Sequence, residues 1–266
     1  VAHHLVVDGV SWRILLPDLG LAWGQIVSGQ EKIELAAVGT SLRRWAHGLV
    51  EAAPSHRDEL GLWERILEGP DPLLGVRPFD PSVDTASTVE RFDISVPASD
   101  TEALLTSVPS LFRGGVADGL VAALGLALVR WRRDRGIESS SALVKFEGHG
   151  REEAVVPGAD LSRTVGWFTS AYPVRVDLAG VDVDEAFAGG DAIGAAVKAV
   201  KEQLLAIPDK GMGFGLLRYL DGESSERLAA VVKSPQISFN YLGRVSAADV
   251  PVELAAIGWA PTDALG

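Results

Sequence analysis

Hydrophobic residues recur at helical spacing in several stretches of the chain. In residues 41–50, Leu42, Trp45 and Leu49 fall on one face of a helix, and residues 58–67 repeat this pattern. Residues 193–204 predict a longer helix that ends before a proline. Residues 119–131 are apolar nearly all round and end among arginines, which favour a helix C-terminus. We therefore expect a buried central helix there.

Other stretches alternate between apolar and polar side chains, as half-buried strands do. Phe92, Ile94 and Val96 alternate with polar residues and predict a strand. Ser99 and Glu102 then match a capping box and predict the start of a helix. Further strands are predicted over residues 142–146, 174–178 and 237–241. Because helices and strands mix along the chain, we expect an α/β or α+β fold with layered sheets and helices.

Breaks in these patterns are densest in residues 68–87, which contain four prolines and two glycines. Neither a helix nor a strand tolerates this density. A chain of 266 residues is long enough for two lobes. We therefore expect the remainder of a first lobe in residues 1–80, ending in this proline-rich linker, and a second lobe in residues 81–266.

Composition and charge narrow the possible function classes. Hydrophobic residues make up 47% of the chain and charged residues 23%, as in an ordinary globular protein. Acidic residues number 36 against 24 basic ones, and the net charge of −12 argues against nucleic acid as a partner. The longest uncharged apolar stretch, residues 119–129, is shorter than the roughly 20 residues that cross a bilayer. We expect no membrane span.

The chain contains no cysteine, which excludes disulfides, thiolate metal sites and a cysteine nucleophile or base. This is consistent with a cytoplasmic location, which we adopt as an expectation. No metal-spaced His, Asp or Glu cluster and no pyridoxal lysine motif is evident in the sequence, so we predict neither a metal nor a directly bound cofactor. The chain starts with neither Met nor a signal segment, and we expect it to be a piece of a longer polypeptide.

The sharpest local feature is the sequence HHLVVDGVSW at residues 3–12. Two adjacent histidines point in different directions on a regular backbone, so at most one of His3 and His4 can face a given cavity. The carboxylate of Asp8 can pin a turn or pair with an arginine, and Gly9 permits the positive φ of a sharp loop. Taken alone, a double histidine is more often a structural pair in a turn.

The complete pattern, two histidines followed after three residues by Asp-Gly, resembles the signature of the condensation-domain superfamily of non-ribosomal peptide synthetases. Four further segments resemble core motifs of one branch, the epimerization domains, and stand in that family's order. They are EGHGRE at residues 147–152, RTVGWFTS at 163–170, PDKGMGFGLLRY at 208–219 and FNYLG at 239–243. Because the matches extend over nearly the whole chain, the resemblance is specific.

The resemblance implies two chloramphenicol-acetyltransferase-like lobes in a V, with the first lobe incomplete in this chain. It also implies a reaction, the L to D inversion at Cα of an aminoacyl or peptidyl thioester held on the phosphopantetheine arm of a peptidyl carrier protein. The carrier protein and neighbouring synthetase domains are the implied partners. Two alternatives stay open: a condensation-type domain that forms peptide or ester bonds, and an inactive fragment that only docks a carrier protein.

The same resemblance assigns site residues. His4 and Glu147 are the predicted catalytic pair. Glu147 would remove the Cα proton, while His4 would supply the second proton-transfer group or stabilise the enolate oxygen. The expected supporting or structural residues are His3, Asp8, Gly9, His149, Arg151 and Arg163, with Asp8 paired to Arg151 or alternatively to Arg163. The residues expected to line the substrate channel are Tyr172, Asn240 and Tyr241.

Plainer interpretations compete at several positions. Without its motif, Glu147 at a strand end would be a solvated surface charge, and Tyr241 is explained equally well as a core aromatic residue on a strand. The tryptophans, Trp167 among them, are expected to serve packing. His47 and His56 are expected on the exposed sides of helices, without a role in the site.

Overall fold

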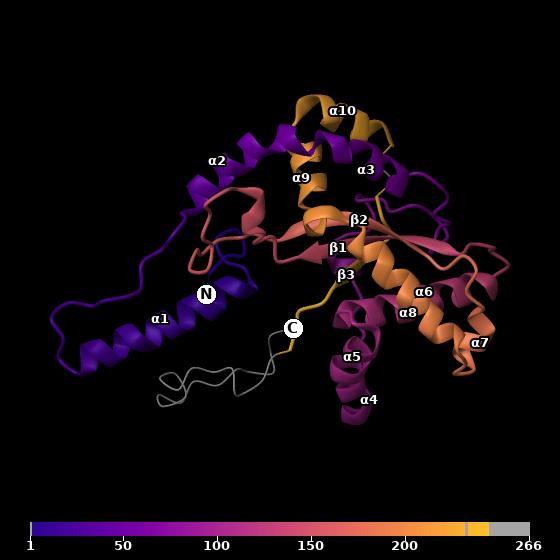
Figure 1. Cartoon of the computed structure of the whole chain (residues 1–266), viewed down its shortest axis with the longest axis horizontal. Helices are drawn as coiled ribbons and strands as arrows, with labels where there is room; N and C mark the ends of the chain where they lie inside the picture. Colours follow the sequence, from indigo (N-terminus) through magenta and orange to yellow (C-terminus); the bar gives the residue numbers. More distant parts are fainter. Residues whose placement is uncertain (1, 232–233, 245–266) are drawn as a thin grey trace.

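The computed structural model describes residues 2–231 and 234–244. A three-stranded sheet lies at its centre (Figure 1). The middle strand, β1 (Ser141–Gly148), pairs antiparallel with β2 (Ser170–Asp177) and parallel with β3 (Ile237–Asn240). The predicted strands over residues 142–146, 174–178 and 237–241 are thus confirmed, the second as far as residue 177 and the third as far as residue 240.

The register of the sheet decides which side chains share a face. Phe146 pairs with Tyr172 on one side and with Phe239 on the other, while Glu147 pairs with Asn240. Because successive side chains of a strand point to opposite faces, Glu147 and Asn240 project from the face opposite to the aromatic residues.

Helices surround this sheet. They are α1 (Gly9–Val27), α2 (Leu42–Ala52), the 3₁₀ helix η1 (Ala53–Glu59), α3 (Leu60–Leu67), η2 (Ala86–Thr88), α4 (Ala98–Glu102), the π-helical turn η3 (Ala103–Ser107), α5 (Val108–Phe112), α6 (Val116–Arg133), η4 (Glu153–Val155), α7 (Val183–Phe187), α8 (Ala192–Leu205), η5 (Pro208–Gly211), α9 (Met212–Tyr219) and α10 (Gly222–Val231). In Figure 1, α2, α3, α9 and α10 lie above the sheet, and α6 and α8 lie below it. The layered α/β class that the sequence predicts is confirmed.

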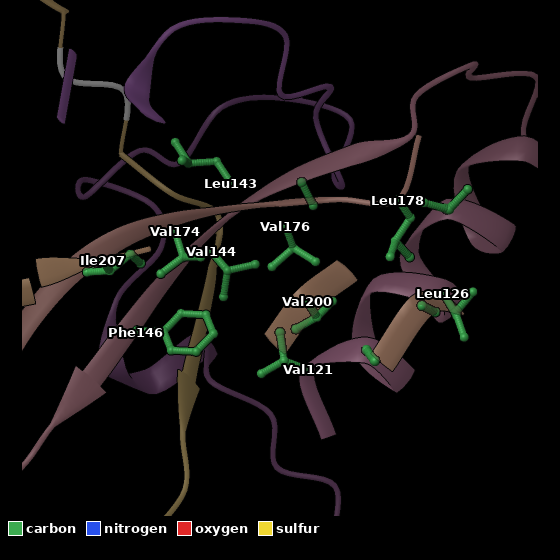
Figure 2. Packing of buried hydrophobic residues seen from close by; sticks show 14 of the residues in the cluster. Val121, Leu126, Leu143, Val144, Phe146, Val174, Val176, Leu178, Val200 and Ile207 are labelled. Atoms are coloured by element: carbon green, nitrogen blue, oxygen red, sulfur yellow. The ribbon is translucent and has the colours of Figure 1, made fainter. Parts of the chain in front are cut away.

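Two hydrophobic clusters hold these layers together. The larger one joins the sheet to α3, α6 and α8, with Val144 and Phe146 of the central strand beside Val121 and Val200 of the helices (Figure 2). Burial of each such side chain contributes roughly 1.5–3 kcal/mol. The smaller cluster joins α2, the loop between β1 and β2, and α9; its buried residues are Trp45, Ala53, Val155, Leu161, Phe168, Met212 and Leu216. This second cluster underlies the site described below.

Helix α6 matches the buried central helix that the sequence predicts. Eight of its residues are buried, and Arg130, Arg132 and Arg133 lie in its last turn. The expected helices over residues 41–50, 58–67 and 193–204 are also present, although residues 58 and 59 belong to the 3₁₀ helix η1. The first helix, α1, projects from the body in Figure 1, and only three of its 19 residues are buried.

The predicted strand around Phe92, Ile94 and Val96 is wrong. These residues belong to no strand, and Phe92 and Ile94 are 82% and 88% exposed. Alternation makes a strand only where a neighbouring strand accepts its backbone hydrogen bonds. Among the described residues no strand pairs with this segment.

The predicted capping box at Ser99 is also wrong. Helix α4 starts at Ala98, so Ser99 lies inside its first turn, and Pro97 occupies the capping position without a side-chain hydrogen bond. The amide of Thr101 instead donates to the carbonyl of Pro97 at 2.9 Å. The helix therefore begins two residues earlier than the cap pattern indicated.

The proline-rich segment after α3 is anchored to the sheet. Asp71 accepts hydrogen bonds from the buried guanidinium of Arg132 at 2.9 Å and from the amide of Leu143 at 3.3 Å. Leu60 and Trp63, which precede the segment, pack in the same cluster as the strands that follow it. The lobe boundary at residue 80 stays a prediction.

Among the described residues, no single helix has both the length and the apolar character needed to cross a bilayer. The segments Ala98–Phe112 and Val116–Arg133 meet that requirement only when taken together, and they are bent by 102°.

Candidate functional site

The double-histidine segment is anchored at its end by Asp8, which caps helix α1. Its Oδ1 accepts the amide and the hydroxyl of Ser11, both at 2.7 Å, and its side chain is only 5% exposed. Gly9, predicted to supply a positive φ, is instead the first residue of α1 and has no positive φ. That prediction is wrong because Asp8, with extended backbone, makes the turn into the helix.

Asp8 also joins this segment to two distant parts of the chain. Arg151 donates to it at 3.1 Å, and the amide of Phe168 donates at 3.2 Å. Arg163 pairs instead with Asp18 at 2.6 Å, so of the two arginines considered, Arg151 is the partner of Asp8. Burial opposes ionisation of Asp8, but the bonds from Ser11 and Phe168 and the charge of Arg151 hold the pKa of its carboxyl below the ordinary value.

The terminal nitrogens of Arg151 are held by several parts of the chain, whereas its buried Nε has no hydrogen-bond partner. It donates to the carbonyls of Leu161 and Thr164 at 3.1 and 2.6 Å, and its guanidinium lies 4.0 Å from the centre of the Phe168 ring. Its side chain is 8% exposed. A cation held this rigidly ties the loop between β1 and β2 to the start of α1.

The two histidines have different surroundings. Nδ1 of His3 accepts the amide of Leu5 at 3.1 Å. The ring of His4 lies 5.0 Å from the indole of Trp167, and both histidines are exposed. Trp167, expected to serve packing, is 47% exposed and forms part of this surface. Since Trp167 precedes Phe168, the Asp8 bond to Phe168 also positions the partner of His4.

Glu147 lies near the end of β1. Its Oε2 accepts from Nδ2 of Asn240 at 3.0 Å, its Oε1 accepts from the hydroxyl of Ser238 at 3.3 Å, and Lys145 lies 3.4 Å away. The side chain is 27% exposed. The carboxylate is therefore oriented by β3 but still open to a reactant.

Gly150 lets the chain after β1 pass close to the backbone of Phe168, just before β2. It has a φ of +64°, and an added Cβ would collide with the carbonyl of Phe168. Only glycine accommodates both conditions. The chain after β1 therefore passes close to Phe168, whose amide donates to Asp8.

His149 lies beyond the end of β1. Its Nδ1 accepts the amide of Arg151 at 3.0 Å, and its Nε2 lies 3.4 Å from Glu152, which also receives Nζ of Lys210 at 3.1 Å. These contacts shape the loop that carries Arg151 and connect it to η5.

Two of the predicted channel residues, Tyr172 and Asn240, project from opposite faces of the sheet. Asn240 contacts Glu147, as described. Tyr172 packs 6.5 Å from Trp63 and 6.0 Å from Phe146, and burial, together with the charge of Glu152, raises the pKa of its hydroxyl. Tyr241 follows β3 and is 37% exposed, so the alternative of a core aromatic residue does not fit it.

The expected position of His56 on an exposed helix side is wrong. His56 lies in the 3₁₀ helix η1 and is 8% exposed. An α-helical pattern places His56 on the wrong side of this segment, because a 3₁₀ helix has three residues per turn and an α-helix has 3.6. With Glu59 and Asp209 it forms the group, among the described residues, whose donor atoms could hold a metal ion.

Comparison with known proteins gives consistent matches. A family model described as condensation domain matches residues 1–256. The chain is 47% identical over 255 residues to one of the subunits of the linear gramicidin synthase from Brevibacillus parabrevis, a match covering 94% of this chain and 3% of that relative. It thus spans only a small part of the relative's length.

Solved structures match as well. The epimerization domain from the third module of tyrocidine synthetase B is 33% identical, with a TM-score of 0.75 over 90% of this chain and 52% of that one. The first condensation domain of the CDA synthetase, 18% identical, superposes with a TM-score of 0.54 over 94% of this chain and 48% of that one. These likenesses confirm the predicted fold class.

Proposed function

The chain belongs to the condensation-domain family, and from this premise we propose that it inverts the configuration at Cα of an aminoacyl or peptidyl thioester in non-ribosomal peptide synthesis. The observation that carries the proposal is the 33% identity and TM-score of 0.75 to an epimerization domain. The substrate would be presented on the phosphopantetheine arm of a peptidyl carrier protein. That carrier and the neighbouring synthetase domains would be the partners.

Glu147 is the proposed base. Its carboxylate takes the Cα proton, and the electron pair of the broken C–H bond moves into the thioester carbonyl to form an enolate. Return of a proton to the opposite face of Cα restores the thioester with inverted configuration. The bonds from Asn240 and Ser238 support this role because they fix the direction of the carboxylate while leaving part of it exposed.

His4 is the proposed second group. It either protonates the opposite face or stabilises the enolate oxygen. The contact with Trp167 supports the assignment because it orients an otherwise exposed imidazole. A thioester acidifies its Cα proton, so the proposed reaction needs no metal and no pyridoxal group.

The experiment follows hydrogen exchange at Cα. A carrier protein loaded with an L-aminoacyl or peptidyl thioester is incubated in D₂O with the native polypeptide that carries these residues, and the released acid is analysed by mass spectrometry and chiral chromatography. We expect uptake of one deuteron and formation of the D epimer. The loaded carrier alone measures spontaneous exchange.

Condensation is the second candidate, since the matching family model is described as a condensation domain. In that reaction an amine or alcohol attacks the thioester carbonyl, the thiol of the arm leaves, and the Cα hydrogen stays in place. An added acceptor-loaded carrier tests this in the same assay. A new peptide or ester bond without deuterium uptake overturns the epimerase proposal, and the absence of both reactions supports the fragment that only docks a carrier.

A further inference from the structure

A group of three possible ligands lies outside the proposed catalytic pair, where η1 meets η5. His56 and Glu59 are three residues apart in η1. Side chains at this spacing eclipse one another in a 3₁₀ helix, so both point in the same direction. Asp209 of η5 joins them from 150 positions further along the chain, with its Oδ2 3.7 Å from Nε2 of His56. One donor atom from each residue lies within 4.8 Å of the others.

The tautomer of His56 suits coordination. Its Nδ1 lies 3.0 Å from the carbonyl of Ala52, which can only accept, so Nδ1 carries the hydrogen. The hydroxyl of Ser55 donates to the same carbonyl at 2.7 Å. In the neutral form Nε2 is therefore left with its lone pair, and it lies 3.7 Å from Oδ2 of Asp209. A histidine whose second nitrogen donates to a backbone carbonyl is the usual arrangement in protein metal sites.

The two carboxylates are held in place by the surrounding fold. Oε2 of Glu59 accepts the indole N–H of Trp63 at 3.1 Å, and Gly213 packs so closely on this carboxylate that an added Cβ would collide with it. Asp209 and Lys210 both have left-handed backbone angles, with φ of 43° and 48°. The turn thus keeps the Asp209 carboxylate beside a buried imidazole.

An ion would reach this group through an open groove. A cavity of about 900 Å³ lies between α2 and residues 154–159, and both His56 and Asp209 line it. The Asp209 side chain is 47% exposed, whereas the His56 side chain is 10% exposed. Water in the groove can complete the coordination that three protein ligands leave open.

We propose that His56, Glu59 and Asp209 bind one divalent transition-metal ion of the zinc class. One imidazole nitrogen with two carboxylates suits Zn²⁺ better than Mg²⁺ or Ca²⁺, which prefer oxygen ligands throughout. The ion would clamp η1 to η5. Since Lys210 of η5 also contacts Glu152 beside Arg151, the clamp would steady the loop behind the catalytic residues without contacting substrate.

The test uses the full chain, stripped with a chelator and titrated with zinc chloride by calorimetry. We expect one zinc ion bound at this group and a melting temperature that rises with zinc concentration, since a ligand that binds the folded state stabilises it. His56→Ala should weaken zinc binding at this group by at least about 100-fold. Loss of a residue that only hydrogen-bonds a metal ligand costs up to about 100-fold in metal affinity, and loss of a ligand should cost at least as much. The same variant should also lose the zinc-dependent rise in melting temperature.

A second variant covers the case in which His56→Ala fails to fold. Asp209→Asn keeps a residue that tolerates the left-handed conformation and removes only the ligand charge, so it should fold and still lose the ion. His47→Ala, an exposed histidine of the same groove, is the matched control and should bind zinc like the parent. The proposal is overturned if the parent binds no zinc, or if Asp209→Asn keeps the stoichiometry, affinity and thermal gain of the parent.

The result of the zinc titration can be told apart from the result of the Cα exchange assay. Zinc binding and melting are measured without substrate, and the proposed exchange reaction uses no metal. If Cα exchange slows on chelation and recovers with zinc, the Asp209→Asn variant should be equally slow with and without chelator, because the proposed ion acts through the loop and not in the proton transfer.

Discussion

At the residue scale, Asp8 combines three tasks in one buried carboxylate. It caps α1, accepts the amide of Phe168 and pairs with Arg151. Each contact ends on a different stretch of sequence, and together they bring the double-histidine segment to the sheet. Its removal would leave Arg151 buried without its ionic partner, which is costlier than loss of a surface pair.

We therefore predict that Asp8→Ala lowers the free energy of unfolding by about 3 kcal/mol, as expected when one partner of a buried pair is removed. Urea unfolding at neutral pH measures this. Asp18→Ala removes the partner of Arg163, a more exposed pair, and should cost no more than about 1 kcal/mol. A variant of Asp8 that melts like the parent but has lost Cα exchange would show that Asp8 acts in the chemistry instead.

Residue by residue, the site is predictable from the sequence only in part. The pairing of Asp8 with Arg151 or Arg163 is what the family resemblance implies, whereas the residues alone leave open whether Asp8 pins a turn or pairs with an arginine; in the structure it does both. The bond between Glu147 and Asn240 does not follow from the motifs, since it depends on the register of β1 and β3. His56 is misplaced because periodicity alone does not distinguish a 3₁₀ turn from an α-helix.

At the element scale, apolar runs with local signals are the easiest to predict. Helix α6 is recognisable because its apolar surface and terminal arginines lie within one continuous segment. The segment around Phe92 has an equally clear alternation, yet it forms no strand among the described residues because strand formation depends on a distant partner. No local pattern predicts the ion pair that connects η1 to the start of α10, because its two residues are far apart in the sequence.

The ion pair between η1 and the start of α10 is formed by Arg57 and Asp221. Arg57 donates two hydrogen bonds to the Asp221 carboxylate, at 2.7 and 2.6 Å, and the hydroxyl of Ser224 donates a third at 2.7 Å. Arg57 first, and then Ser224, lower the pKa of Asp221 to about 2, from an ordinary value of 3.8. A carboxyl with a depressed pKa stabilises the fold above its unfolded pKa, and this contribution is lost as the pH falls through the folded value.

We predict that Asp221→Asn melts at a lower temperature than the parent at neutral pH. The difference should shrink as the pH falls below about 3.8 and disappear below about pH 2, once the parent carboxyl is itself mostly protonated. Thermal melts across this range measure it. Asp93→Asn, in an exposed pair with Arg91, should match the parent throughout. A melting difference that stays constant down to the lowest pH would contradict the assigned role of the charge.

At the scale of the whole molecule, the proposed catalytic residues lie 143 positions apart, and no hydrogen bond, ion pair or ring contact joins them in the described part of the chain. His4 lies beside Trp167, four residues before Asp8, whereas Glu147 lies on the central strand. Both assignments come from the resemblance and stay predictions. Their arrangement depends on Gly150, Phe168 and Arg151, whose contacts appear only in three dimensions.

We predict that Glu147→Gln slows inversion in both directions, and deuterium uptake from the enantiomer whose proton faces Glu147, by at least about 100-fold, because glutamine keeps the shape and hydrogen bonding of the side chain but removes the base. The measurement is the Cα exchange assay on the native polypeptide. Glu90→Gln, the same change at an exposed position, should exchange like the parent. Exchange by Glu147→Gln at the parental rate would exclude Glu147 as the base.

His4→Ala distinguishes the two roles left open for His4. If His4 exchanges the proton on the opposite face, its loss should leave deuterium wash-in from the enantiomer whose proton faces Glu147 and should block both inversion and wash-in from the other enantiomer. If His4 only stabilises the enolate oxygen, both enantiomers should slow by a similar factor, because the enolate is common to both directions. We expect one of these two patterns, and parental rates with both enantiomers would remove His4 from the mechanism. The asymmetric pattern would further require that His4 and Glu147 face opposite sides of Cα, a geometry that a structure with a bound thioester analogue would test.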